Sequence, residues 1–378
     1  MKKKGIIAIV IIILLGVIIT TMFISKNNQK FIMQDGMMLA VTLDGESITS
    51  FPERGAYNIE IDCGNTAKGI WLVEDWTLGA EDITGDVKCN VSFTTNPTTL
   101  KSKVETVNAS QNYNSHGYRY SGKTPSNWVW FNGEKWRIIG SIPVCLTESC
   151  GANTTNLVKI IRSEPIGTYA YDAKSSGYTG VWGSNTLYSL LNTYYYASDA
   201  TAMNGQSHAG CYGYYRSSYQ PKPNCDYTEI GILSSSYYGK MVKNVYWNTG
   251  ASAYNVTPSA AYATEIGTQT VSGYIGLMTA SDWGYAASSS FHSIAMNSYT
   301  SSSNKATETS WIFNNGYEWT SIQNSSNTYN ALGVASDGRL NYNGAYVGYA
   351  VRPVVYLDSS VYIISGDGTE GNQYQIGM

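Results

Sequence analysis

The segment 128–139, with the sequence WVWFNGEKWRII, constrains the fold of this chain more than any other. It consists of two apolar runs joined by Asn132-Gly133, and this dipeptide between such runs favours a two-residue type I′ turn with positive φ at both positions. A turn of this length fixes the register of the strands that it joins, and here it places Phe131 opposite Glu134. The sequence therefore predicts a β-hairpin.

The two faces of this hairpin differ in character, because side chains alternate along a strand. One face is entirely apolar and is expected to enter the core: Val129, Phe131, Trp136 and Ile138. The other face pairs Trp128 with Arg137 and Trp130 with Lys135, and cation–π contacts in such pairs contribute about 0.5–1 kcal/mol each. These features describe a fold and indicate no reaction.

The N-terminal segment 1–30 predicts a membrane anchor. Three lysines at positions 2–4 precede residues 5–24, a run of twenty residues without a charge. As a helix this run spans the ~30 Å hydrocarbon core of a bilayer, and the lysines place the N-terminus in the cytoplasm. The membrane is therefore an expected partner through residues 5–24, and the bulk of the chain is expected to be extracellular.

Two other interpretations of this segment remain open. A cleaved signal peptide would have a shorter apolar core and a small-x-small cleavage site, which Ile24-Ser25-Lys26-Asn27 matches poorly. A type IV prepilin would carry a glutamate five residues after the cleaved glycine, where this chain has Val10. The sequence favours an uncleaved, single-pass signal anchor.

The cysteines predict disulfide bonds, because their number is even and the chain is expected to be exported. Six cysteines allow 15 connectivities, of which proximity favours Cys63 with Cys89, Cys145 with Cys150 and Cys211 with Cys225. A zinc site is the alternative, but no C-x-x-C occurs and the three histidines lack ligand spacing. We therefore expect no metal and no cofactor.

The composition favours β-structure with long polar loops. Charged residues make up only 13% of the chain, and 32 tyrosines accompany many Ser, Thr, Asn and Gly residues. The formal net charge of -3 gives no strongly basic surface, so a nucleic-acid partner is not expected.

The sequence patterns divide the chain into four parts. Residues 1–30 form the anchor, and residues 31–95 hold four or five short strands that predict a small β-sandwich, stapled by one disulfide. Residues 96–127 predict a helix followed by a polar linker. Residues 128–378 predict a larger α+β domain of strands with a single clear helix.

Local signals locate several of these elements. The first helix is expected to begin at Pro97, with Thr95 or Asn96 as its cap, and to end near Val107. In the large domain, a helix capped by Ser184 is expected to carry Leu187, Leu190, Leu191 and Tyr194 on one face. Further expectations are strands at 157–161, 274–278 and 351–357, a helical turn at 281–283, and a hairpin around Asp367-Gly368 that returns through 374–376.

Several motifs in the same order resemble a known domain family. They are Tyr120-Ser121-Gly122 before the hairpin, VKIIRSEPIG (158–167), YIGLMTASDWGYA (274–286), VRPVVYL (351–357) and GDGT (366–369). Together, over residues 118–378, they resemble a domain of unknown function in anchored surface proteins of Gram-positive and gut bacteria. Its fold is related to C-type lectins and the formylglycine-generating enzyme.

The resemblance implies a C-type-lectin-like fold for the large domain. In that fold a terminal hairpin and a late strand close a mixed sheet beneath long irregular loops, and segments 128–139 and 351–357 would supply these parts. The enzymatic branch of the fold depends on a cysteine pair late in the domain, and no cysteine follows Cys225. The resemblance therefore implies no enzymatic activity here.

The segment 211–225 is the candidate ligand-binding loop. Closed by a disulfide and rich in Tyr and Ser, it is similar in composition to an antibody paratope, and sugar rings also stack on tyrosine faces. The candidate binding residues are Tyr212, Tyr214, Tyr215, Arg216 and Tyr219. The alternative is a surface loop that packs these tyrosines on its own domain.

Other polar residues have weaker claims to a site. Four carboxylates could supply a pair for glycoside hydrolysis, but their spacing fixes no separation, and scattered acids are usually solvated or capping. They are Glu265, Asp282, Glu308 and Glu318. The Asp367-Gly368 and Asp337-Gly338 pairs indicate turns rather than calcium loops. Arg352, within an apolar strand, is expected to pair with a carboxylate or to extend its charge to solvent.

These observations favour an anchored extracellular binding or adhesion protein whose loops contact a glycan or a protein. No catalytic residue is assigned. The alternatives are a surface hydrolase acting on envelope polysaccharide and a pilus-like structural subunit.

Overall fold

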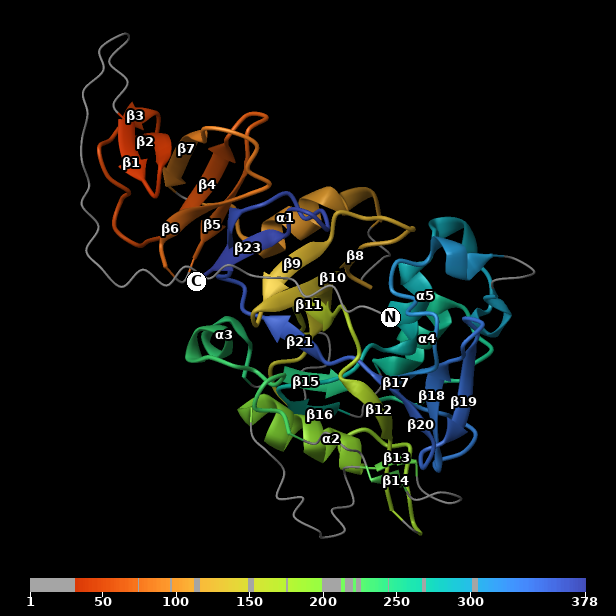
Figure 1. The fold of residues 1–378 in the computed structure, drawn as a ribbon. Coiled ribbons are helices and arrows are strands. Elements are labelled where there is room, and N and C mark those ends of the chain that lie inside the picture. The colour runs from red at the N-terminus through yellow and green to blue at the C-terminus, as the bar shows by residue number, and fades with distance from the viewer. Residues whose placement is uncertain are drawn as a thin grey trace. The chain divides into compact units, whose positions relative to one another are not determined.

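A computed structural model describes residues 31–73, 75–95, 97–111, 116–148, 153–174, 176–198, 212–214, 220–221, 226–243, 245–266, 270–300 and 305–378. The protein is a mixed α+β structure with more strand than helix, and its strands form several sheets (Figure 1). It separates into two compact units. Apart from residues 56–58, which group with the second unit, the N-terminal unit runs to Thr95 and the C-terminal unit follows.

The N-terminal unit is built of strands. They are β1 (Phe31–Gln34), β2 (Met37–Leu43), β3 (Glu46–Ser47), β4 (Tyr57–Asp62), β5 (Lys68–Leu72), β6 (Thr77–Glu81) and β7 (Lys88–Thr95). One sheet has the order β1-β2-β7-β4 with β3 on β2, and β5 and β6 form a separate hairpin. The ring of Trp71 in β5 packs edge-on against Phe93 of β7, with 5.2 Å between ring centroids. The predicted Cys63–Cys89 disulfide is confirmed.

The C-terminal unit contains two larger sheets and several short helices. Its strands are β8 (Tyr118–Arg119), β9 (Trp128–Phe131), β10 (Glu134–Val144), β11 (Thr155–Arg162), β12 (Gly167–Ala170), β13 (Tyr212–Tyr214), β14 (Gln220–Pro221), β15 (Val245–Asn248), β16 (Thr270–Gly273), β17 (Glu318–Gln323), β18 (Asn330–Val334), β19 (Leu340–Gly344), β20 (Gly348–Val351), β21 (Val354–Leu357), β22 (Tyr362–Ser365) and β23 (Tyr374–Gly377). Its helices are α1 (Leu100–Val107), α2 (Thr186–Leu190), the π-helix η2 (Leu191–Tyr195), α3 (Ser235–Lys240), α4 (Pro258–Glu265) and α5 (Ala280–Ala286), with 3₁₀ helices η1 (Ala109–Gln111), η3 (Ser289–Phe291), η4 (Met296–Ser298) and η5 (Ala306–Thr309).

The predicted hairpin is confirmed and occupies the middle of the first large sheet, whose order is β21-β11-β10-β9-β23-β22 (Figure 1). Phe131 pairs with Glu134 and Trp128 with Arg137, as the turn requires. Asn132 and Gly133 both take positive φ, 59° and 74°. The apolar face enters the core, and the Arg137 guanidinium lies 4.0 Å from the ring centroid of Trp128.

Gly133 offers a test of this turn. A Cβ placed there would meet nothing within 4 Å, so Gly133→Ala changes only the cost of its left-handed backbone. We expect this variant to lose about 1–2 kcal/mol of unfolding free energy in urea denaturation. Gly239→Ala in α3 is the matched control, because that site is equally open but its φ is not positive, and it should gain up to about 1 kcal/mol. Equal effects of the two variants would contradict the type I′ turn.

The predicted strand 351–357 is corrected. Val351 ends β20 in a five-stranded sheet of order β12-β20-β17-β18-β19, whereas β21 begins at Val354 in the seven-stranded sheet. Arg352 and Pro353 carry the chain from one sheet to the other. Pro353 has no N–H for a ladder, and the Arg352 side chain turns inward to Glu318.

Two predicted helices differ in detail from the structure. The first begins at Leu100 with Thr99 as its cap rather than at Pro97. In α2 the cap is Asn185 rather than Ser184, because the Asn185 side chain accepts the N–H of Tyr188. The π-helical turn of η2 then shifts the buried face by one residue. For this reason Tyr195 is fully buried in place of Tyr194.

The predicted strand 274–278 is also corrected. The N–H groups of Tyr274 and Ile275 bond to the side-chain oxygen of Asn192 instead of to a neighbouring strand. Only Gly276 forms an isolated bridge, with Val354. The helical turn predicted at 281–283 is confirmed within α5.

The segment 96–127, predicted to be a helix and a linker, groups with the C-terminal unit. Leu100 and Val104 of α1 enter its core, and β8 pairs with β10. The polar sequence after α1 is therefore not a free linker where it is described, since it supplies the buried Arg119.

The predicted anchor, residues 5–24, lies outside the described residues and stays a prediction. Within the described part of the chain, no helix is both long and apolar enough to cross a membrane.

Candidate functional site

A buried group of charges lies where α5 meets the first large sheet. Asp282 near the start of α5 accepts hydrogen bonds from Arg119 Nη1 of β8 at 2.6 Å and from Lys159 Nζ of β11 at 2.5 Å. Its carboxylate also accepts the N–H of Thr279, whose hydroxyl accepts the N–H of Asp282 in a capping box. All three charged residues are at most 2% exposed.

The electrostatics of Asp282 follow from these partners. Burial alone would raise the pKa of its carboxyl. The positive charges of Lys159 and Arg119, together with their hydrogen bonds, outweigh burial and hold the pKa well below its ordinary value of 3.8. Asp282 is thus ionised and fully engaged.

Glu265, at the end of α4, behaves in the opposite way. It is 2% exposed, and its oxygens accept the N–H of Ser281 at 2.8 Å and the hydroxyl of Ser281 at 2.5 Å. Burial raises the pKa of Glu265, and the negative charge of Asp282 adds to this shift. The bonds from Ser281 offset only part of it. This carboxyl links α4 to α5 through its hydrogen bonds with Ser281.

The structure answers the hydrolase prediction for the four carboxylates. It brings Glu265 and Asp282 together but closes both from solvent, so neither presents an oxygen to a polymer. Glu318 lies elsewhere in a buried pair with Arg352, which confirms the predicted carboxylate partner of that arginine. Glu308 is exposed, and its Oε1 lies 3.8 Å from Lys305 Nζ. These four acids therefore form structural contacts, and we assign none of them to catalysis.

The predicted ligand-binding loop is largely outside the described residues. Tyr212 and Tyr214 belong to β13, which pairs with β14. Tyr215, Arg216 and Tyr219 lie outside the described residues, so their binding role stays a prediction.

The remaining cysteines and turns have different outcomes. Cys145 is disulfide-bonded, whereas Cys150, Cys211 and Cys225 lie outside the described residues, so the other pairings stay predictions. Asp337-Gly338 and Asp367-Gly368 form turns, in which each aspartate accepts the N–H two residues on. Among the described residues, no group of three or more His, Cys, Asp or Glu side chains is placed to hold a metal ion.

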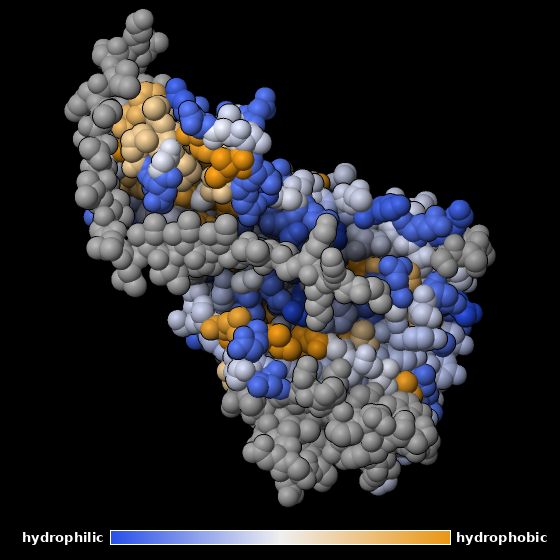
Figure 2. All heavy atoms as spheres, viewed as in Figure 1, coloured by the Kyte–Doolittle hydropathy of each residue, from blue (hydrophilic) through white to orange (hydrophobic). Residues whose placement is uncertain are grey.

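On the face drawn in Figure 2, the described surface of the C-terminal unit is mostly hydrophilic, and its hydrophobic residues form small separate patches. Small apolar patches of this kind are common on protein surfaces.

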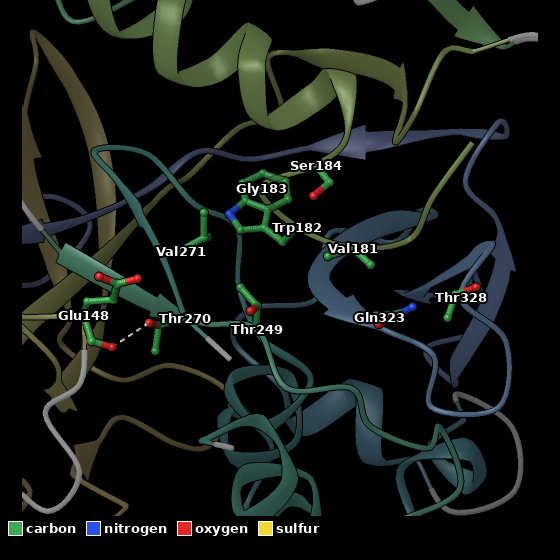
Figure 3. A pocket seen from close by; sticks show the side chains of 10 residues that line it. All are labelled: Glu148, Val181, Trp182, Gly183, Ser184, Thr249, Thr270, Val271, Gln323 and Thr328. Carbon is green, nitrogen blue, oxygen red and sulfur yellow. Dashed lines mark hydrogen bonds between the residues drawn. The ribbon is translucent and has the colours of Figure 1, made fainter. Parts of the chain in front are cut away.

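The C-terminal unit contains a polar pocket of about 610 Å³ (Figure 3). Five separate parts of the chain meet there: the segment after β10, the segment before α2, the residue after β15 with the start of β16, the end of β17, and the loop after β17. The lining residues are Glu148, Val181, Trp182, Gly183, Ser184, Thr249, Thr270, Val271, Gln323 and Thr328. The volume lies in the range of small-ligand sites.

Local contacts hold the pocket walls in place. Gly183 has a φ of +94°, and a Cβ there would lie 2.5 Å from Val271 Cγ2, so glycine lets the segment before α2 approach β16 closely. The N–H of Gly180 donates to the carbonyl of Thr328 at 2.7 Å, and the hydroxyl of Thr270 donates to the carbonyl of Glu148 at 3.2 Å. These contacts fix the walls of the pocket relative to one another.

Two buried nitrogens in these walls have no hydrogen-bond partner among the described residues: Trp182 Nε1 and Gln323 Nε2. Trp182 is 2% and Gln323 7% exposed, so neither is satisfied by bulk solvent. A buried donor without a partner costs about 1–3 kcal/mol, and rotation of the Gln323 amide presents either a donor or an acceptor. Hydroxyl groups of Ser184 and Thr328 stand at exposed positions of the same lining.

Sequence reasoning missed this pocket. Its residues are spread from Glu148 to Thr328, and Ser and Thr are too abundant in the chain for any one to stand out. Comparisons with protein-family models, with curated proteins and with solved structures found no match.

Proposed function

We propose that this chain is an anchored extracellular binding protein that takes a glycan in the polar pocket. The observation that carries this proposal is a cavity of about 610 Å³ lined mainly by hydroxyl, amide and carboxylate side chains. The Cys63–Cys89 disulfide supports an oxidising compartment, which agrees with the predicted anchor at residues 5–24.

The lining chemistry favours a glycan over an apolar ligand. Each sugar hydroxyl both donates and accepts, as do the Ser, Thr and Gln groups of the walls. Among the described lining residues Glu148 alone is charged, so a neutral sugar, whose hydroxyls can donate to its carboxylate, fits better than an acidic one.

We further propose the C-type-lectin-like fold implied by the sequence motifs. Three features support it: the hairpin β9–β10 at the centre of a mixed sheet, β23 running parallel to β9, and β21 on the far side of β11. The pocket lies among loops and strand ends, where the proposed fold would place its ligands. The pilus-like alternative depends on residues 1–30 alone.

Two hydroxyl deletions test the proposed site. Ser184→Ala with Thr328→Val removes two exposed hydroxyls, neither of which has a hydrogen bond within the described residues, so the fold should tolerate both changes. We expect the full chain in lipid nanodiscs to bind at least one glycan of a diverse array. Calorimetry on that glycan should then show about tenfold weaker binding by the double variant.

The control is Thr168→Val, which removes an exposed hydroxyl from β12 outside the pocket and should leave affinity unchanged. An array with no bound glycan, or equal affinities for the wild type and the double variant, would contradict the proposed function.

A further inference from the structure

Three tyrosines form a ledge beside the pocket: Tyr178, Tyr329 and Tyr346. The ring of Tyr178 lies 5.6 Å from that of Tyr329 and 4.9 Å from that of Tyr346, measured between centroids, and both contacts are T-shaped. Tyr329 is 54% exposed, so its ring is not part of the core.

The tyrosine ledge adjoins, along the chain, two segments that line the pocket. Tyr329 directly follows Thr328, which lines the pocket (Figure 3). On the other side, Thr179 and Gly180 follow Tyr178, and the Gly180 N–H donates to the Thr328 carbonyl at 2.7 Å. Tyr178 and Tyr329 therefore lie within two residues of this hydrogen bond between the segment before α2 and the loop after β17, both of which line the pocket.

The ledge is held in place before binding. The N–H of Tyr329 donates to Asn327 Oδ1 at 2.9 Å, and the N–H of Ala345 donates to the carbonyl of Tyr329 at 3.0 Å. Rings that pack against one another lose little rotamer freedom when a ligand covers them. A tyrosine face offers an apolar surface with a polar rim, which matches the C–H face and hydroxyl edge of a sugar ring.

We propose that the tyrosine ledge is a second subsite for the same glycan, so that the natural ligand is a chain of sugar units rather than a single sugar. One unit occupies the polar pocket, and the next lies across Thr328 onto Tyr329. This inference depends on the proposed function, which it deepens by naming the length of the ligand.

The test is a length series. The full chain in nanodiscs is titrated by calorimetry with β-1,4-linked N-acetylglucosamine, glucose and mannose, each from the monomer to the tetramer. In the series that binds, we expect the tetramer to bind about tenfold more tightly than the monomer, from the added burial of an aromatic face. Tyr329→Ala should abolish that gain and leave monomer affinity unchanged, whereas Tyr329→Phe should keep it.

The control is Tyr317→Ala. Tyr317 is 48% exposed but precedes the first residue of β17, at the opposite end of that strand from Gln323, so its removal should leave the length dependence intact. Equal affinity for the monomer and the tetramer, or a gain that survives Tyr329→Ala, would overturn the second subsite. Neither result would contradict glycan binding in the polar pocket. Absence of binding in all three series and on the diverse glycan array would overturn glycan binding in the pocket and the subsite together.

Discussion

Replacement of Asp282 by asparagine is expected to lower the free energy of unfolding of the C-terminal unit by about 3–5 kcal/mol. Asparagine keeps the shape of the side chain and can still accept the N–H of Thr279. It removes only the negative charge. Arg119 and Lys159, which are at most 2% exposed, are then left with no carboxylate between them. Urea denaturation, monitored by hydrogen exchange of peptides from α5, measures this loss of unfolding free energy.

The control for this prediction is Glu308→Gln. Glu308 also pairs with a lysine, at 3.8 Å, but its side chain is 52% exposed. Ion pairs in solvent contribute little, so this variant should lose less than about 1 kcal/mol. Comparable losses in the two variants would show that burial of the Asp282 group is not the source of its effect.

Low pH should weaken the stabilisation that Asp282 provides to Arg119 and Lys159. Because the pKa of Asp282 in the folded unit lies below its ordinary value of 3.8, its contribution to stability is present above that pH. It is lost as the pH falls toward the lower, folded pKa. We therefore expect the difference in stability between the wild type and Asp282→Asn to shrink as the pH is lowered below 3.8.

The second large effect is expected in the N-terminal unit. Cys63 and Cys89 lie 26 positions apart in the sequence, and both are buried. A disulfide that closes such a loop stabilises by about 2–4 kcal/mol, chiefly through the entropy of the unfolded chain. The double variant Cys63→Ala, Cys89→Ala should therefore unfold its N-terminal unit at lower urea concentration.

Hydrogen exchange read by mass spectrometry distinguishes the two units. Peptides of β2 and β7 should lose protection in the double cysteine variant, whereas peptides of β10 and β11 should keep it. Asp282→Asn is the reciprocal control, since it should affect only the second set. Loss of protection in both sets from either change would contradict two independently stable units.

The sequence predicted best where the signal is local. Asn132-Gly133 specifies a turn whose φ values few other dipeptides accept, and the alternating apolar residues around it then assign each side chain to a face. The hairpin register and its buried face were therefore predictable in full. The same holds for the turns at Asp337-Gly338 and Asp367-Gly368, where one residue pair contains the necessary information.

The sequence predicted poorly where a distant residue decides the backbone. The apolar run 351–357 has the pattern of one strand, but Arg352 turns inward because Glu318 accepts its guanidinium at 2.7 Å. Likewise, residues 274–278 have the pattern of a strand, yet the Asn192 side chain takes two of their N–H groups. Neither partner is visible within the windows on which periodicity depends.

The fold and the candidate site differ in how far local sequence determines them. Turn chemistry, strand alternation and the nearness of Cys63 to Cys89 were sufficient for the sequence alone to determine the central hairpin and the disulfide of the N-terminal unit. The polar pocket and its tyrosine ledge were decided only by the tertiary structure. The pocket is lined by Glu148, Trp182 and Gln323, and the ledge includes Tyr329. Both depend on how separate segments pack rather than on any short sequence pattern.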